Sequence, residues 1–378
     1  MACIQPSPPT ICTIFAVMAV CLGGRSAVQA EVHITGGGER GDGEGIGVRS
    51  HTTFPSLIKM SDGTLLCYDM ASRNGGQTWY RYQKFNFPLS DGTRPFRGPN
   101  VTLRDGTILL LGRYTHKHDR KDGIYVVETY RSADNFDSYA GPERGLVHIP
   151  EATAGSTTGN DEYDQPVNGP FFGQSIVELP DGDLVSAMWG WFGEDQTPSG
   201  YPDRWHKLRQ TKSRVLLVRS QDQGATWRYV TTIASDPDPK YGPEGFRYPS
   251  LALLPDGELV CLMRNGDGNT PLWLSRSSGD YHNWGDPEKV DVGASHGDLL
   301  VLSDGTLLMV YGKMLYVMAS PDGGRTWDYK NACFVGCRSA FAYTGQARLA
   351  EVSPGEVLCL YHDRLDLHAR KLTIKRNP

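Results

Sequence analysis

Two stretches of the sequence decide its fold: residues 220–227 read SQDQGATW, and residues 320–327 read SPDGGRTW. Both follow the pattern S-x-D-x-G-x-T-W. An Asp carboxylate accepts hydrogen bonds from backbone N–H groups shortly after it, and a Gly tolerates positive φ angles without steric cost. Each stretch therefore predicts a tight turn between two β-strands, and its recurrence indicates a repeated structural unit.

Other stretches resemble this turn less closely. Residues 132–139 and 277–284 read as worn copies of it. Residues 72–79 read SRNGGQTW, with Asn74 in place of the Asp, and they follow the preceding apolar run closely. We therefore do not count residues 72–79 as a further copy.

A second repeat extends along the whole chain. Six times, a short apolar run enters a turn and a second apolar run leaves it, and the copies read FPSLIKMSDGTLLCY, GPNVTLRDGTILLLG, QSIVELPDGDLVSAM, YPSLALLPDGELVCL, HGDLLVLSDGTLLMV and QARLAEVSPGEVLCL. Five copies have an Asp-Gly pair, which suits a tight hairpin because both positions accept positive φ angles, and the sixth is degenerate, with Pro354 in place of the Asp. Each copy predicts two strands of a four-stranded blade, so the sequence predicts an all-β fold, a six-bladed β-propeller.

The sixth hairpin is followed only by residues 367–376, which leaves its blade one strand short. We expect residues 32–35 to supply that strand, because pairing there would close the ring and cover a sheet edge. Residues 31–378 are therefore predicted to form one large propeller domain, a size that closed β architectures allow.

The repeated turn resembles the Asp-box, or BNR repeat, of the sialidase (neuraminidase) superfamily. The resemblance covers nearly all of residues 31–378. It implies that these turns join the third and fourth strands of a blade, on the face opposite the active site. It also implies a carbohydrate-active enzyme, although a shared fold does not fix a function.

Composition excludes several other classes of function. The 378 residues have a formal net charge of -5 and no run of Lys or Arg, so nucleic-acid binding is not expected. Residues 11–24 are apolar but too short to span a bilayer, and small residues lead to Ala30. We expect residues 1–30 to be a signal peptide and the protein to be secreted or periplasmic; a lipid anchor at Cys21 is the less favoured alternative.

The cysteine and histidine patterns do not predict a cofactor. Cys67, Cys261 and Cys359 lie inside apolar runs and are expected in the core. Cys333 and Cys337 are close enough to form a disulfide, which the sequence leaves open. His116 and His118 stand in a polar, charged loop, so we interpret them as solvated and predict no metal site.

Matching positions of the six hairpins can be compared because side chains alternate along a strand. Eight residues before each turn, where the central funnel is expected to open, stand Phe54, Arg97, Gly173, Tyr248, His296 and Gln346. Two residues deeper stand Ser56, Pro99, Ser175, Ser250, Asp298 and Arg348, and eight residues after each turn stand Met70, Arg113, Trp189, Arg264, Gly312 and His362. Asp298 and Arg348 are interpreted as a buried ion pair that braces the channel.

The resemblance to sialidases breaks down at the catalytic positions. Thr53 takes the place of the family's carboxylate-binding arginine in the first blade. The family's glutamate in the fourth blade falls on Tyr248, and its tyrosine nucleophile in the sixth blade falls on Gln346. The fourth-blade arginine carries over onto Arg264. Sialic acid is therefore a doubtful substrate, and a uronate is a reasonable alternative.

Two insertions are expected on the same face as the funnel mouth, at residues 141–169 and 190–213. Long loops on a rigid scaffold commonly bind ligands. The second insertion combines flat aromatic side chains with carboxylates, a mixture that suits sugar rings: Trp191, Phe192, Glu194, Asp195, Tyr201 and Trp205. The alternative is a loop that plugs the funnel or contacts a second subunit.

These observations predict an enzyme that hydrolyses a glycosidic bond in an acidic glycan, without a cofactor. Arginine binds carboxylates through paired hydrogen bonds, and His and Tyr transfer protons. The expected acid, base or nucleophile groups are His296, Tyr248, Glu194 and Asp195. The expected substrate-binding residues are Arg97, Arg264, Gln346, Trp191, Trp205, His51 and Arg113. A lyase acting on a uronate and a non-catalytic glycan-binding propeller remain open, and the oligomeric state is not predicted.

Overall fold

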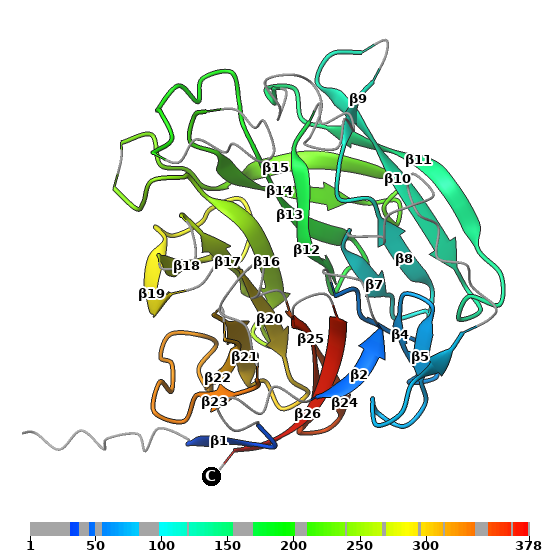
Figure 1. Ribbon diagram of the computed structural model, residues 1–378. Coiled ribbons are helices and arrows are strands. Elements are labelled where there is room, and N and C mark those ends of the chain that lie inside the picture. The colour runs from blue at the N-terminus through cyan, green and yellow to red at the C-terminus, as the bar shows by residue number, and fades with distance from the viewer. Residues whose placement is uncertain are drawn as a thin grey trace, which may run out of the picture.

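The computed structural model describes residues 31–37, 45–49, 55–82, 98–118, 121–153, 169–200, 210–238, 240–266, 270–293, 296–312, 314–336, 347–363 and 366–376. Within these ranges every regular element is a strand. The strands form antiparallel groups that follow one another round a ring in chain order (Figure 1). No helix in the described part of the chain is long and apolar enough to cross a membrane.

The first three groups contain the N-terminal half of the ring. The first is β3 (Ile58–Lys59), β4 (Leu65–Cys67), β5 (Met70–Ser72) and β6 (Tyr80–Arg81). The second is β7 (Asn100–Thr102), β8 (Ile108–Leu111), β10 (Ile124–Ser132) and β11 (Ala140–His148), with the short β9 (His116–Lys117) beside β10. The third is β12 (Phe171–Glu178), β13 (Leu184–Gly190), β14 (Arg214–Ser220) and β15 (Thr226–Ala234).

The remaining groups complete the ring. The fourth is β16 (Arg247–Leu253), β17 (Leu259–Arg264), β18 (Pro271–Arg276) and β19 (Glu288–Gly293). The fifth is β20 (Gly297–Val301), β21 (Leu307–Tyr311), β22 (Tyr316–Ser320) and β23 (Cys333–Phe334). The last contains β24 (Ala347–Ser353), β25 (Glu356–Asp363), β26 (Asp366–Arg376) and β1 (Val32–Thr35), and β2 (Ile46–Arg49) also pairs with β26.

The second and third groups are joined into one nine-stranded sheet. Their outer strands β11 and β15 pair in parallel at Leu146–Thr226, Val147–Trp227 and His148–Arg228, whereas the strands inside each group pair antiparallel. Divided at this parallel contact, the described strands give six antiparallel groups. The prediction of an all-β propeller is confirmed.

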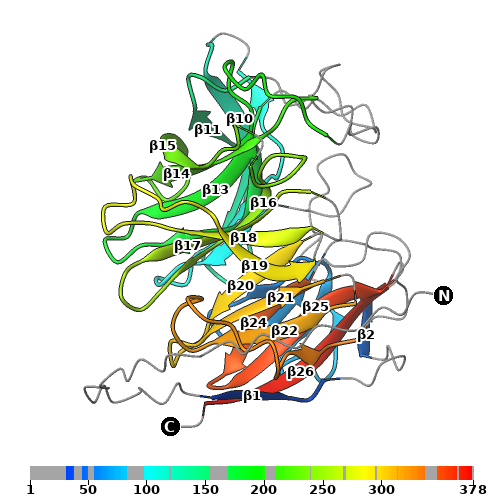
Figure 2. The same cartoon turned by 90° about the vertical axis from the view of Figure 1, so that its left-hand side faces the viewer.

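The ring closes where the sequence predicted. β1 pairs antiparallel with β26, from Val32 opposite Arg376 to Thr35 opposite Thr373. Both views show β1 alongside β26 at the edge of the last sheet (Figure 2). The N-terminal strand therefore supplies the fourth strand of the blade that the C-terminal strands begin.

The repeated turns form the hydrogen bonds that their sequences predict. In residues 220–227, the Asp222 carboxylate accepts from the Thr226 N–H at 2.7 Å, and the Ser220 hydroxyl accepts from the Gly224 N–H at 2.7 Å. The Trp227 indole N–H donates back to the Gly224 carbonyl at 3.1 Å. The equivalent bonds of residues 320–327 have lengths of 2.9 Å to Asp322 and 2.6 Å to Ser320.

Excluding residues 72–79 was wrong. The Asn74 side-chain oxygen accepts from the Thr78 N–H at 3.0 Å, and the Ser72 hydroxyl accepts from the Gly76 N–H at 2.9 Å. The Trp79 indole N–H donates to the Gly76 carbonyl at 3.1 Å, as the Trp227 indole does to the Gly224 carbonyl in residues 220–227. An amide oxygen accepts the same hydrogen bonds as a carboxylate oxygen, so Asn74 builds the same turn.

The core lies between neighbouring blades and consists of the inward faces of the strands. Its largest clusters contain aliphatic side chains together with Phe171, Trp189, Trp191 and Trp227. Cys67, Cys261 and Cys359 are buried in it, as predicted. Cys337 lies outside the described residues, so the disulfide with Cys333 stays untested, as does the signal peptide in residues 1–30.

Candidate functional site at the mouth of the propeller

The site is built around an irregularity in the first strand of the fourth group. Arg247 pairs with Arg264, but the next pair is Ser250 with Leu262, so β16 contains one extra residue at this point. Such β-bulges redirect side chains and are common beside active sites. Tyr248 lies in the bulge with a φ of 51°, a strained conformation for a bulky side chain.

Four side chains from different blades surround the Tyr248 ring. The guanidinium carbons of Arg264 and Arg113 lie 4.3 and 4.9 Å from the ring centroid, within cation–π range. The His296 ring contacts Tyr248 edge-on at 4.5 Å between centroids, and the Trp189 ring lies 5.2 Å away. The structure therefore brings together Tyr248, His296, Arg264 and Arg113, which the strand register had predicted to meet at the mouth.

A buried carboxylate holds one of these arginines. Glu244 Oε1 accepts hydrogen bonds from Arg264 Nη2 at 3.0 Å and from Arg247 Nη1 at 2.7 Å. The Glu244 side chain is only 7% exposed, and that of Arg247 is 1% exposed. Charge-assisted hydrogen bonds of this kind are strong where water is excluded. Glu244 therefore fixes the position of Arg264 beside Tyr248.

The segment that contains Glu244 is itself anchored by buried polar groups. Asn265 Oδ1 accepts from the backbone N–H groups of Glu244 and Gly245 at 3.1 and 2.9 Å. The Lys212 ammonium pairs with the Asp236 carboxylate, and both side chains are almost fully buried. Lys212 also donates to the Gly242 carbonyl. These contacts fix the backbone that presents Glu244 to the two arginines.

The histidine in the cluster is held neutral. Burial lowers the pKa of His296 well below its ordinary value, and the nearby charges of Arg264, Arg113, His362 and Arg348 lower it further. Both effects act in the same direction, because burial and neighbouring cations each destabilise the imidazolium. At neutral pH His296 is therefore a neutral imidazole, which is able to accept a proton.

A second polar level lies deeper in the central channel. Arg348 Nη1 contacts Asp298 Oδ1 at 3.2 Å, and the Ser250 hydroxyl donates to the same carboxylate at 2.8 Å. The Ser175 hydroxyl accepts from the Leu251 N–H at 2.7 Å. The predicted ion pair between Asp298 and Arg348 is therefore present, and it is mostly buried.

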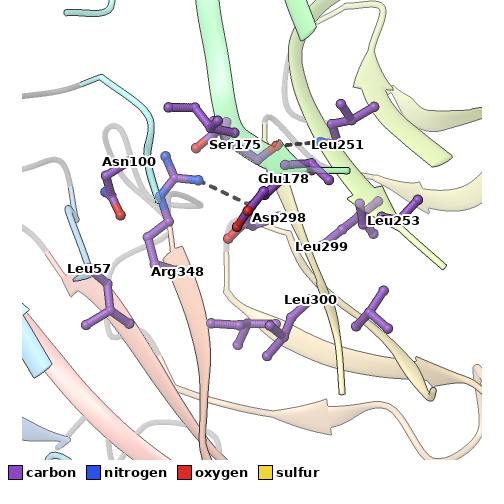
Figure 3. Close-up of a pocket in the computed structure, with 16 residues that line it drawn as sticks. Leu57, Asn100, Ser175, Glu178, Leu251, Leu253, Asp298, Leu299, Leu300 and Arg348 are labelled. Atoms are coloured by element: carbon purple, nitrogen blue, oxygen red, sulfur yellow. Dashed lines mark hydrogen bonds and ion pairs between the residues drawn. The ribbon is translucent and has the colours of Figure 1, made fainter. Parts of the chain in front are cut away.

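This level borders a cavity of about 370 Å³. Figure 3 shows Arg348 and Asp298 joined across it, with Leu57, Asn100, Ser175 and Leu300 around them. The cavity is lined by residues from the innermost strands and their flanks, and it includes none of the four residues around Tyr248. It is part of the channel below the mouth, and the candidate chemistry lies above it.

Glu194 and Asp195 belong to a different cluster. Asp195 Oδ1 contacts Arg214 Nη2 at 2.5 Å, and Glu194 Oε1 contacts the same nitrogen at 2.8 Å. Asp195 also accepts from the Phe192 N–H at 2.6 Å, and the Arg214 guanidinium lies over the Phe192 ring. Both carboxylates therefore bind Arg214 at the start of β14, and their ion pairs within the described residues do not include the residues around Tyr248.

The aromatic residues of the second insertion differ from the expected exposed sugar platform. Trp191 is fully buried, donates to the Thr211 carbonyl at 2.8 Å and packs edge-on against Trp189 at 5.7 Å. The reason is that the ends of the insertion are part of the core, so Trp191 packs there and cannot stack on a sugar in this conformation. Tyr201 and Trp205 lie outside the described residues.

His51, Arg97 and Gln346 also lie outside the described residues, so their expected contacts with substrate stay predictions. Among the described residues, no group of three or more His, Cys, Asp or Glu side chains could hold a metal ion. Sequence reasoning missed Glu244 and Arg247. Their signal was the pair of opposite charges three residues apart that leads directly into a first strand at the mouth.

Comparisons with known proteins agree with the fold. The sequence profile described as a BNR repeat-like domain matches residues 173–333. No match was found among curated proteins. A solved structure of a protein of unknown function from Dyadobacter fermentans has a TM-score of 0.61 and 19% identity, over 88% of this chain and 97% of that chain.

Two solved structures of enzymes are also similar. The GH93 α-L-arabinofuranosidase of Fusarium graminearum has a TM-score of 0.56 and 15% identity, over 87% of this chain and 96% of that chain. The Hadza microbial sialidase Hz136 has a TM-score of 0.55 and 16% identity, over 88% of this chain and 68% of that chain. This chain therefore shares the β-propeller fold of these solved structures, and at these identities the similarity concerns the fold alone.

Proposed function

We propose that this protein is an exported enzyme that hydrolyses a glycosidic bond in an acidic glycan, and that the cluster around Tyr248 is its active site. The observation that supports this most strongly is the placement of two guanidiniums and a neutral imidazole against one phenol ring. Cations bind a substrate carboxylate, and the phenol and the imidazole supply a proton donor and a proton acceptor. The similarity in fold to two glycosidases agrees with this proposal.

The chemistry divides between Tyr248 and His296. His296 accepts a proton from the attacking water as the water oxygen bonds to the anomeric carbon. Tyr248 donates its hydroxyl proton to the leaving glycosidic oxygen as the bond to the anomeric carbon breaks. The flanking guanidinium of Arg264 stabilises the negative charge that develops on the phenol oxygen. Solvent then returns a proton to Tyr248 and removes one from His296.

A lyase acting on a uronate is the second candidate, and one observation favours it. Glu194 and Asp195, the expected carboxylates, are engaged with Arg214 in a separate cluster. A lyase requires an arginine to neutralise the uronate carboxylate and a neutral base to remove the proton beside it. Tyr248 would then protonate the leaving oxygen. The described cluster supplies these groups without a carboxylate nucleophile.

Product analysis distinguishes the two reactions. The purified chain is incubated in ¹⁸O-labelled water with oligogalacturonate, hyaluronan oligosaccharides and sialyllactose, and the products are followed by mass spectrometry and ultraviolet absorbance. Hydrolysis incorporates one labelled oxygen and creates no ultraviolet chromophore. A lyase creates an unsaturated sugar that absorbs ultraviolet light and contains no label. Binding without either product would contradict the proposal of an enzyme and favour a glycan-binding propeller.

A further inference from the structure

The two arginines against the Tyr248 ring differ in their partners. Arg264 contacts the Glu244 carboxylate at 3.0 Å, and its side chain is 12% exposed. Arg113 lies against the same ring, yet among the described residues no carboxylate lies within ion-pair distance of it. Within the described part of the chain, a carboxylate therefore neutralises the Arg264 guanidinium, and none neutralises that of Arg113.

The electrostatic surroundings of Arg113 make its position costly. It is only partly exposed, and it shares the Tyr248 ring with a second cation. The charge of Arg113 also contributes to the low pKa of His296, so it acts on the centre of the cluster. A partly buried cation without a counter-ion raises the free energy of the unliganded protein, and an anionic ligand relieves that cost.

The backbone holds Arg113 in place independently of its charge. The Arg113 carbonyl accepts from the Phe172 N–H at 2.9 Å, which ties the end of β8 to the start of β12. The preceding Gly112 N–H donates to the Glu128 carbonyl at 2.8 Å. The position of residue 113 is therefore set by main-chain contacts, and a neutral side chain there leaves those contacts intact.

Arg264 has the opposite character. Its partner Glu244 is buried, also binds Arg247, and stands on a backbone that Asn265 fixes from the end of β17. A guanidinium held in this way keeps a constant position against the Tyr248 ring. Its contribution is therefore to orient Tyr248, whether the substrate is charged or neutral.

We propose that Arg113 is the residue that selects an acidic substrate, and that Glu244 commits Arg264 to positioning Tyr248. This division of roles rests on the proposed function. It predicts that the preference for a carboxylate over its uncharged ester depends on Arg113. It also predicts that the rate of bond cleavage depends on Arg264, and that a change at Arg264 leaves the preference for the carboxylate unchanged.

The test compares each acid with its methyl ester as substrates of Arg113→Gln, Arg264→Gln and the unaltered chain. The substrates are oligogalacturonate, hyaluronan oligosaccharides and sialyllactose. The unaltered chain should favour the acid by about 10-fold or more in kcat/KM, since the contact is charge-assisted. Arg113→Gln should reduce this preference to about 1. Arg264→Gln should lower kcat for acid and ester alike and keep the preference.

Controls separate a role in specificity from a role in folding. Arg219 pairs with Asp181 and Asp183 beside a far-face turn, so Arg219→Gln should leave the acid preference unchanged. Arg113→Lys keeps the charge and should restore part of the preference that Arg113→Gln loses. Thermal unfolding of each variant shows whether the propeller is intact.

The outcomes distinguish this proposal from the one on which it rests. An acid preference in the unaltered chain that persists in a folded Arg113→Gln variant would overturn the role given to Arg113. Loss of the preference in Arg264→Gln would overturn the role given to Arg264. An unaltered chain that favours none of the acids over its ester would overturn the acidic-glycan function itself.

Discussion

The far-face turns and the mouth are built from opposite kinds of contact. In the turn at residues 220–227, the bonds of Ser220, Asp222 and Trp227 all close within eight residues of sequence, and other blades repeat the same pattern. At the mouth, Tyr248 is surrounded by residues from four separate groups, and these contacts have no equivalent elsewhere in the described chain. The repeated turns therefore specify the fold, and the candidate site lies where the contacts differ from one blade to the next.

The largest effect that tests this contrast is expected at Arg264. Arg264→Ala removes a guanidinium 4.3 Å from the Tyr248 ring and one partner of the buried Glu244. The cost should be about 2 to 4 kcal/mol of transition-state stabilisation, measured through kcat/KM on the acidic glycan that is cleaved. Arg219→Ala, the far-face control, should leave kcat/KM nearly constant. Equal losses in both variants would remove the distinction between the two faces.

The next largest effect is expected in the far-face turns, where substitutions should lower the stability of the fold without changing the activity. Asp222→Ala and Asp322→Ala each remove an acceptor for a backbone N–H of the turn and for a neighbouring serine hydroxyl. Each should lower the free energy of unfolding by about 1 to 3 kcal/mol, measured by denaturant titration. The KM for the glycan should stay nearly constant because these turns lie at the far ends of the strands. A folded variant with abolished glycan binding would mean that the far face takes part in the site.

A smaller effect is expected in the pH profile. Because the pKa of His296 is lowered, this residue stays neutral as pH falls through the ordinary histidine pKa near 6.5. The loss of kcat/KM at acidic pH should therefore occur below pH 6.5. Removing the Arg113 charge takes away a cation that destabilises the His296 imidazolium, so the pKa of His296 rises. Arg113→Gln should therefore move the loss of kcat/KM at acidic pH to a higher pH, by about 0.5 unit or more. A loss that occurs above pH 6.5 in the unaltered chain would contradict a neutral base in the cluster.

The same depression affects stability. Below pH 6.5 the unfolded chain binds a proton at His296 that the folded chain does not bind, so this residue makes the protein less stable as pH falls. His296→Gln should therefore lose less stability than the unaltered chain between pH 7 and 5. Identical pH dependence of unfolding in the two proteins would indicate that the imidazole is not depressed.

The smallest effect is expected at Asn74. Asn74→Asp converts the turn at residues 72–79 to the form of the two full copies, with a charged acceptor for the Thr78 N–H. Unfolding free energy should rise by up to about 1 kcal/mol, since charge-assisted hydrogen bonds are stronger than neutral ones. Differential scanning calorimetry of this variant beside Asn74→Ala, which should be destabilised, tests the assignment. Destabilisation by both substitutions would mean that the amide makes a contact that a carboxylate cannot replace.

The parts of the molecule that repeat could be predicted from the sequence. Counting from each Asp-Gly turn placed Tyr248, His296 and Arg264 at one level, and Asp298 with Arg348 two residues deeper, because strand alternation fixes which side chains share a face. The closing strand at Val32–Thr35 followed from the missing strand of the last blade. Each of these predictions needs only local periodicity.

The parts that do not repeat could not be predicted in the same way. Glu244 lies before β16 and Arg247 is its first residue, so neither falls on a position that we compared across the hairpins. The ion pair of Glu244 with Arg264 joins residues 20 apart in the chain. Trp191 stands in a stretch whose composition suggests an open loop, yet contacts with Trp189 and Thr211 bury it. Asp195 looked catalytic by residue type, and its partner Arg214 follows 19 residues later in the chain.

The most direct test of the central claim is the turnover of the cleaved acidic glycan by His296→Ala and Tyr248→Phe, compared with Glu194→Gln. If the cluster around Tyr248 is the active site, each of the first two variants should lose about 100-fold or more in kcat while keeping the unfolding temperature of a folded propeller. Glu194→Gln should retain most of the activity, because Glu194 contacts Arg214. Folded His296→Ala and Tyr248→Phe variants with unaltered kcat, together with an inactive Glu194→Gln variant, would contradict the claim and move the chemistry to the Arg214 cluster.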